Sequence, residues 1–200
     1  NAVLGKVIIK SAGDNRYVAT TGNNISNDCT LPGSPCLTIA HALSVAIDED
    51  SVIVSPGNYA LTSVLNITQD GLTLTAANVA NKPVVTTNQA NVIDVNAENV
   101  EINGFEFAMG LTATTGIKGI VSTANNFNHL TVTNNDFVSS AALDSEGMVW
   151  TAFAVQLSSA AGQTDTITVT DNTVATSAAN LNVFGRGIYL GSGSTNAPGG

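Results

Sequence analysis

Short runs of alternating apolar and polar residues fill most of the chain, and one pattern among them recurs. The pattern is apolar–x–apolar, then a few small or polar residues, then a further apolar residue. It begins at Val52, Leu72, Val100, Leu130 and Ile167, and the distance between successive starts increases along the chain. Alternation with a period of two predicts strands with one buried and one solvent-facing side. A recurring unit with connections of variable length is typical of a solenoid, whose turns stack as parallel sheets.

A second set of short apolar segments precedes the later units at a nearly constant distance: Val92–Val95, Gly119–Val121 and Val155–Leu157. Each turn therefore has two or more strands. Asn135 and Asn172 occupy the same corner of successive units, where asparagine adopts the left-handed conformation and bonds neighbouring backbone. We expect only a short ladder there, because Phe105 occupies this place one unit earlier.

One helix precedes the first unit. From Thr38 to Ile47, apolar residues follow the i, i+3, i+4, i+7, i+8 spacing of an amphipathic helix. Its start is marked either by Ser34 with Pro35 in the first turn or by Thr38 as the N-cap. The end of a strand stack exposes apolar side chains and unpaired backbone, so we expect this helix to cap the amino-terminal end of the sheets.

Cys29 and Cys36 enclose a short loop rich in turn residues, and no third cysteine or nearby pair of histidines completes a zinc site. We interpret them as a disulfide, which would stabilise the fold by about 2–3 kcal/mol through loop entropy. Such a bond persists in oxidising compartments, which predicts a location outside the cytoplasm.

Charged residues make up 10% of the chain, and fifteen acidic against six basic residues give a net charge of −9. This balance leaves no basic surface for phosphate backbones, so nucleic acid is excluded as a partner. No apolar run approaches the roughly 18 residues of a membrane span, and we expect no membrane insertion. We expect a secreted, extracellular or cell-surface chain whose signal peptide has been removed.

Four segments together resemble the entry of one known family: Tyr17–Gly22, Asn27–Cys29, Pro35–Ala42 and Ile53–Tyr59. Secreted right-handed parallel β-helix proteins of the pectate-lyase-like superfamily often begin with a strand, a loop with a cysteine pair, a Thr-Ile-x-x-Ala helix and a strand with Pro-Gly-x-Tyr. Asp48–Ser51 departs from the family's Gly-Asp turn. The resemblance implies an all-β right-handed parallel β-helix with an N-terminal capping helix. It implies no single function, since this fold hosts lyases, hydrolases, adhesins and tailspikes.

The patterns and the resemblance divide the chain into four parts. Residues 1–16 are an N-terminal strand or arm, and residues 17–51 are a cap with the disulfide loop and the helix. Residues 52–190 are the parallel β-helix, and residues 191–200 are a Gly/Ser-rich tail or linker.

The sequence offers no catalytic or cofactor-binding constellation, and this favours a protein that is not an enzyme. A lyase similar to those of the family needs clustered carboxylates for calcium and a Lys or Arg base. Among the cations, only Arg16, Lys118 and Arg186 lie outside the amino-terminal strand and a proline-flanked loop. The Asn-Thr-Asp, Asp-Asp and Gly-His-Gly motifs typical of galacturonan hydrolases are absent.

Two acidic groups are candidates for cation binding. Asp48, Glu49 and Asp50 crowd the last turn of the helix, where the macrodipole disfavours negative charge, so they form either a calcium site or an ordinary acidic turn. The second group either pairs across adjacent turns or is solvated in loops, and it comprises Asp136, Asp144, Glu146, Asp165 and Asp171.

Histidines and aromatic residues give further candidates. His41 and His129 have no triad partner at a suitable spacing, and we interpret both as surface or loop residues. Trp150, Phe153 and Tyr189 form either a sugar-stacking platform or part of the core.

The two ends of the chain suggest how it assembles. The strand Gly187–Leu190 is not followed by a further unit, and Ala2–Lys10 is an apolar, β-prone segment without an obvious partner. One hypothesis is end-to-end association, in which the amino-terminal strand of one chain completes the open carboxy-terminal end of the next. The alternative is a truncated longer protein in which Ala2–Lys10 is an early strand. The assembly candidates are Val3, Val7, Ile9, Ile188 and Leu190.

We therefore expect a secreted structural or cell-surface protein, a filament subunit or adhesin-like stalk that forms homo-oligomers through its ends. The alternative is a carbohydrate-active protein with a polysaccharide partner. It would be either a calcium-dependent polysaccharide lyase or a glycan-binding module that uses the insertions around residues 138–165.

Overall fold

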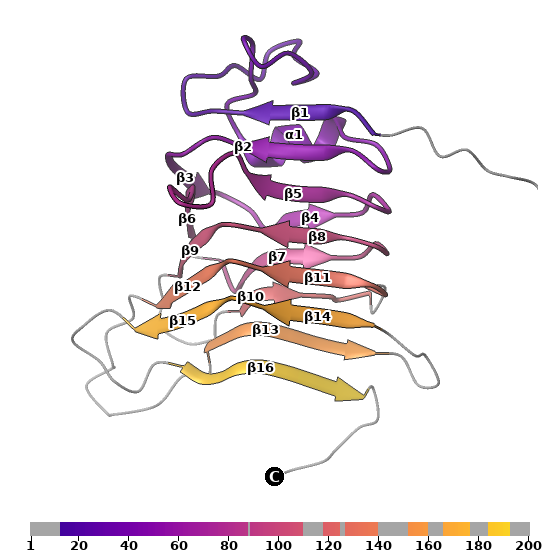
Figure 1. Ribbon diagram of the computed structural model, residues 1–200, viewed down its shortest axis with the longest axis vertical. Coiled ribbons are helices and arrows are strands. Elements are labelled where there is room, and N and C mark those ends of the chain that lie inside the picture. Colours follow the sequence, from indigo (N-terminus) through magenta and orange to yellow (C-terminus); the bar gives the residue numbers. More distant parts are fainter. Residues whose placement is uncertain are drawn as a thin grey trace, which may run out of the picture.

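The computed structural model describes residues 13–87, 89–109, 118–124, 127–139, 152–159, 166–176 and 184–192 (Figure 1). Within these ranges the chain is mostly β, with one short helix, α1 (Ile39–Val45), and three parallel sheets.

Each sheet is a stack of short strands. Sheet A has, in order, β1 (Asn15–Val18), β2 (Ser51–Val54), β5 (Thr73–Ala76), β8 (Glu101–Asn103), β11 (Leu130–Thr133) and β14 (Ile167–Thr170). Sheet B has β3 (Asn58–Leu61), β6 (Val84–Thr87), β9 (Glu106–Met109), β12 (Asp136–Ser139) and β15 (Thr173–Thr176). Sheet C has β4 (Leu65–Ile67), β7 (Asn91–Val95), β10 (Lys118–Val121), β13 (Ala152–Ser159) and β16 (Phe184–Ser192).

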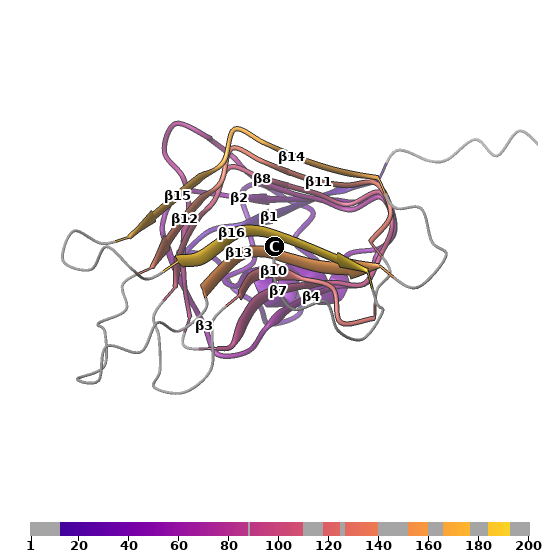
Figure 2. The ribbon, with the colours of Figure 1, turned by 90° about the horizontal axis from the view of Figure 1, so that it is seen from below.

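From β2 onward the chain visits the sheets in rotation, from A to B to C and back to A. Seen from one end, the three sheets surround a common interior (Figure 2). Paired residues stack in register, so that Leu74 of β5 lies between Val52 of β2 and Ile102 of β8. The expectation of an all-β fold built from parallel sheets is confirmed.

The recurring sequence unit corresponds to a strand of sheet A followed by a strand of sheet B, and the segments between units supply sheet C. One unit deviates. The pattern that begins at Leu72 predicts Val79 as the next apolar anchor, but Val79 lies in a loop and is 47% exposed. Val85 of β6 takes the buried place instead, because residues 77–83 lengthen this corner.

The core is filled by the inward-facing residues of all three sheets. Val52, Leu74, Ile102 and Val132 of sheet A are fully buried, because each is covered by the equivalent residue of the turns above and below. Phenylalanine rings continue this stacking where the chain enters sheet B. The ring centroids of Phe105 and Phe107 are 5.7 Å apart, and those of Phe107 and Phe137 are 5.2 Å apart. Burying such side chains is the main favourable term in folding.

Left-handed backbone makes the corner between sheets A and B. It lies at Gly104, Asn134 and Asp171, with φ of 85°, 56° and 56°. The expectation of this conformation at Asn135 and Asn172 is wrong, because it lies one residue earlier in each unit. A single left-handed residue bends the chain from sheet A into sheet B, and the residue after it, Phe105 or Asn135, is buried at the corner.

The asparagine ladder itself is confirmed. The Asn135 Oδ1 atom accepts a hydrogen bond from the backbone N–H of Phe105 at 2.9 Å, and the Asn172 Oδ1 atom accepts one from the N–H of Asn135 at 2.9 Å. The Asn135 amide also donates to the carbonyl of Ile102 at 3.0 Å. Asn135 is fully buried, so these bonds satisfy backbone groups that water does not reach.

The cap closes the first end of the stack. Thr38 is the N-cap of α1, and its hydroxyl accepts the N–H of His41. Helix α1 packs against β1, β2 and β4 through Ile39, Ala42 and Leu43, which are buried (Figure 1). The helix ends at Val45, earlier than the apolar spacing predicts, and Ile47 is 62% exposed.

We predict that Asn135→Leu destabilises the protein by about 2–4 kcal/mol, because the N–H of Phe105 and the carbonyl of Ile102 lose a buried partner. The matched control is Asn66→Leu in β4, where the asparagine is exposed and makes no hydrogen bond with a described residue; its effect should stay within about 0.5 kcal/mol. Urea unfolding followed by circular dichroism measures both. Equal destabilisation by the two variants would contradict the ladder.

Candidate functional site

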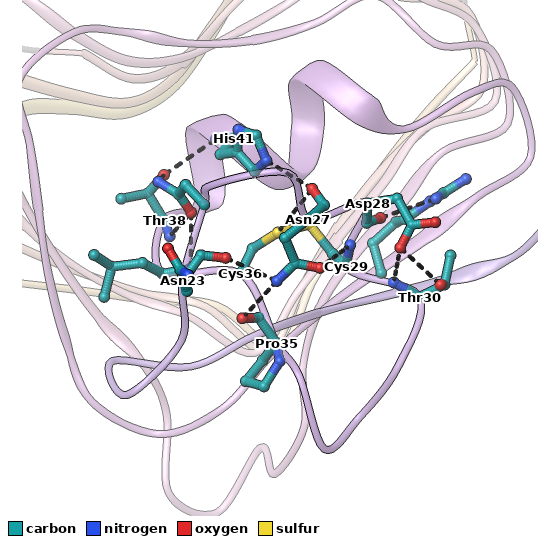
Figure 3. Close-up of a disulfide and its surroundings, with 12 residues drawn as sticks. Asn23, Asn27, Asp28, Cys29, Thr30, Pro35, Cys36, Thr38 and His41 are labelled. Carbon is teal, nitrogen blue, oxygen red and sulfur yellow. Dashed lines mark hydrogen bonds between the residues drawn. A yellow bond between two sulfur atoms is a disulfide. The ribbon is translucent and has the colours of Figure 1, made fainter.

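The disulfide between Cys29 and Cys36 is present, as the sequence analysis predicted, and both residues are fully buried. Asn27 organises the loop around it (Figure 3): its side-chain amide donates to the carbonyls of Asn23, Ser34 and Pro35. These bonds hold the loop in a compact form at the end of the molecule.

The same loop covers the outer edge of β1. The N–H of Tyr17 donates to the carbonyl of Cys29 at 2.7 Å, and the N–H of Cys36 donates to the carbonyl of Tyr17 at 2.8 Å. The N–H of Ala19 completes the contact by donating to the carbonyl of Cys36 at 2.9 Å. An unpaired strand edge templates association with other strands, so this loop protects sheet A at the capped end.

His41 lies beside the disulfide, half-buried, with its Nε2 atom 2.8 Å from the carbonyl oxygen of Asn27 (Figure 3). Its ring nitrogen and the two sulfur atoms lie within 4.8 Å of one another. Both sulfurs are bonded to each other and are not thiolates, so this group does not bind metal in the oxidised protein. No other group of three His, Cys, Asp or Glu side chains comes this close among the described residues.

The structure gives Asp48, Glu49 and Asp50 separate roles. Asp50 is fully buried, and its Oδ2 atom pairs with the Arg16 Nε atom at 2.8 Å and accepts the N–H of Ile47. Asp48 accepts the N–H of Asp70 on the next turn, and Glu49 has the left-handed φ of 69° that turns the chain. This geometry favours the acidic turn over the calcium site.

An ion pair that the sequence does not predict lies beside sheet B. The Lys82 Nζ atom lies 2.7 Å from the Asp136 Oδ2 atom, and the Thr173 hydroxyl donates to the other carboxylate oxygen. Lys82 lies in a proline-flanked loop, and no local sequence signal predicts a contact between residues 54 positions apart. Partial burial raises the pKa of Asp136, but hydrogen bonds from Lys82 and Thr173 outweigh it and hold that pKa below its ordinary value.

The remaining candidates do not gather into a site. Asp171 turns a corner, and His129 is exposed with a left-handed φ of 59°. Phe153 pairs with Arg186 and Lys118, whereas Tyr189 pairs with Gln156. Positions 153 and 156 differ by an odd number of residues, so the two aromatic positions alternate in sheet C and do not belong to one row of it. Seven candidate residues lie outside the described ranges: Asp144, Glu146, Asp165, Trp150, Val3, Val7 and Ile9. Ile188 and Leu190 lie on β16, an edge strand of sheet C.

A hollow of about 300 Å³ lies beside the cap. One wall is β3 and the residues after it, and the other is Thr20 with the residues that begin α1. Tyr59 belongs to the first wall, and burial raises the pKa of its phenol. A second hollow of about 370 Å³ adjoins it along α1 and β4, sharing Ala40 and Ser63 with the first.

Exposed apolar side chains concentrate at the two ends. Among the described residues, six large apolar side chains are exposed: Ile25, Leu31, Leu37, Ile47, Val79 and Val174. Four belong to the cap and Val174 belongs to the last strand of sheet B, at opposite ends of the stack (Figure 1). Of these six described side chains, Val79 is the one that lies along the side.

Comparisons with known proteins support the fold. No family model and no curated protein matches this chain. One solved structure, titled rhamnogalacturonan lyase, is similar with a TM-score of 0.55 and 14% sequence identity. The match covers 94% of this chain but 64% of that lyase. A likeness at this identity shows a shared β-helix-like fold and not a shared activity.

Among the described residues, no helix is both long enough and apolar enough to cross a membrane.

We predict that Asp136→Asn lowers stability by about 0.5–1 kcal/mol near pH 7, because it removes the charge that pairs with Lys82. The pKa of Asp136 is depressed in the folded state, so its contribution is present above the unfolded pKa of about 4 and is lost as the pH falls through the folded value. Thermal unfolding of both proteins from pH 7 to pH 3 should therefore converge at the acid end. A difference that does not depend on pH would contradict the pairing.

Proposed function

We propose that this chain is an extracellular right-handed parallel β-helix that associates through its ends into a filament or stalk. The observation that carries the proposal is the distribution of exposed large apolar side chains: among the described residues, five of the six lie at the two ends of the stack, and Val79 lies along the side. The disulfide supports an oxidising, extracellular location.

Two arguments support the right-handed coil. The chain visits three parallel sheets in rotation, so each return to sheet A is a crossover between parallel strands. Such crossovers are right-handed in nearly all proteins, because strand twist favours that hand. The likeness to the rhamnogalacturonan lyase supports a β-helix-like fold, to which this hand then applies.

The end opposite the cap supports association. Ile167, Val169 and Val174 occupy inward positions, since they pair with Leu130, Val132 and Phe137 of the preceding turn. The residues of the preceding turn are buried almost completely, whereas Val174 is 43% exposed and the other two are partly exposed. Among the described residues, β14, β15 and β16 are also the edge strands of their sheets.

Apolar side chains beside unpaired strand edges favour association with another protein surface. Each molecule has such a surface at both ends, so contacts propagate along the stack instead of closing into a small ring. The outward positions along the sides are polar, for example Thr131, Thr133 and Thr168, and they favour contact with water over association.

We predict that the paired change Ile25→Asp and Leu31→Asp in the cap prevents polymer formation, because it places charge on apolar positions that are 81% and 65% exposed. The matched control is Val79→Asp, a similar change on the side of the stack. Negative-stain electron microscopy and sedimentation velocity of the non-reduced proteins measure the result. The wild type and the control should form fibres, and the cap variant should sediment as nothing larger than pairs of molecules.

Dispersed wild-type particles at high protein concentration would overturn the proposal. Fibres that persist in the cap variant would exclude the cap from the interface.

A second candidate function is carbohydrate recognition or cleavage, and the likeness to a polysaccharide lyase favours it. A calcium-dependent lyase would release unsaturated products, which absorb in the ultraviolet, from an acidic polysaccharide. Incubation with a panel of acidic polysaccharides and calcium, with and without chelator, tests this candidate. Products that form only with calcium would support the lyase, and retention on the polysaccharide without products would support a glycan-binding module.

A further inference from the structure

Sheet B begins one strand later than sheet A. The first turn contains β1 of sheet A, and α1 packs above β4, where sheet C would continue (Figure 1). Between β1 and α1 the chain forms the disulfide loop and no strand of sheet B. Among the described residues, β3 is therefore the edge strand of sheet B at the capped end.

The hydrogen-bond pattern shows which groups of β3 face this open edge. The N–H of Val84 in β6 donates to the carbonyl of Gly57 at 2.8 Å, so Gly57, Tyr59 and Leu61 direct their backbone groups toward β6. In a parallel strand alternate residues bond to opposite neighbours. The backbone groups of Asn58 and Ala60 therefore point away from β6, and no described residue bonds to them.

The 300 Å³ hollow lies along this open edge. Asn58 and Ala60 line it directly, and Thr20, Leu37 and Ala40 line the opposite wall. Tyr59 and Leu61 add apolar surface from the inward side of β3, and no described lining residue is charged. An open strand edge beside a partly apolar hollow is the arrangement that accepts an added strand.

We propose that this hollow accepts residues 2–10 of a second copy of this chain as an added strand of sheet B. In an extended conformation Val3, Val7 and Ile9 share one face, which suits the apolar side of the hollow, while Lys6 and Lys10 share the other. Residues 1–10 contain two of the six basic residues and no acidic one, so their charge complements a chain with a net charge of −9.

The acceptor belongs to another copy because of where β1 begins. Its first residue lies on the side of the molecule away from β3 (Figure 1), so the chain's own arm would have to cross the width of sheet A before pairing with β3. Donor and acceptor belong to the same end of the molecule, so two copies exchange arms reciprocally and form a two-fold pair. This inference rests on the proposed end-to-end association, and it supplies the joint between two capped ends.

The experiment uses the full chain and measures the dissociation constant of the pair by sedimentation equilibrium. Ala60→Pro removes the N–H that faces the hollow but keeps the bonds to β6, and proline is tolerated on such an edge. We expect it to raise the dissociation constant about tenfold. The matched control, Ala60→Ser, keeps the N–H and should leave the constant unchanged.

A second pair of variants tests the donor. Val7→Asp places charge on the face that enters the hollow and should weaken pairing, whereas Ile8→Asp places the same charge on the outward face and should not. Thr62→Trp, which fills the hollow from its exposed rim, should weaken pairing without a change in β3. An excess of a synthetic peptide of residues 1–10 should separate the pairs.

The outcomes distinguish this inference from the proposed function. If the chain associates but none of these changes alters the dissociation constant, the strand acceptor is wrong while end-to-end association stands. If the wild type stays a single particle at all concentrations, both fail. Equal effects of Val7→Asp and Ile8→Asp would contradict the alternating register of the arm.

Discussion

The pairing of backbone groups between stacked turns is the constraint on which this structure depends. Each strand in a parallel stack needs a neighbour above and below, and only the ends leave groups unpaired. At the capped end the disulfide loop bonds to the edge of β1, and α1 covers sheet C beside β4. Among the described residues, β3 of sheet B keeps an open strand edge there that no helix or strand covers, at Asn58 and Ala60. The features that bear on function therefore lie at the ends of the stack.

Within the body, polar side chains bond to one another and to backbone groups that the sheet ladders leave without a partner. Asn135 bonds backbone groups of two turns in a site that water does not reach, and Asp50 is buried with Arg16 beneath the cap. Lys82, just before β6, pairs with Asp136 at the start of β12, so this contact joins two turns that are separated by the turn of β9. A chain with few charges places two of its six basic residues in such ion pairs, which indicates a structural use of these charges.

Local patterns predicted the fold well, because each strand unit carries its own alternation and turn residues. The helix cap at Thr38, the disulfide and the asparagine ladder were also predictable, since each depends on residues close in sequence or on repetition of one unit. The buried pair of Arg16 and Asp50 and the contact of Lys82 with Asp136 were not, because no sequence signal fixes which distant residues meet. The open edge of β3 follows only from which sheet lacks a strand, and topology alone reveals that.

Hydrogen–deuterium exchange across a range of protein concentrations tests the central claim most directly. The account predicts that the amide of Ala60 and the amides at the open edges of β14 and β15 exchange rapidly in dilute solution and slowly in concentrated solution, because association pairs them. Amides between two strands, such as those of β8, should be slow at every concentration. Exchange at Ala60 and at the last turn that does not change with concentration would contradict the claim that the ends of this molecule bind other copies.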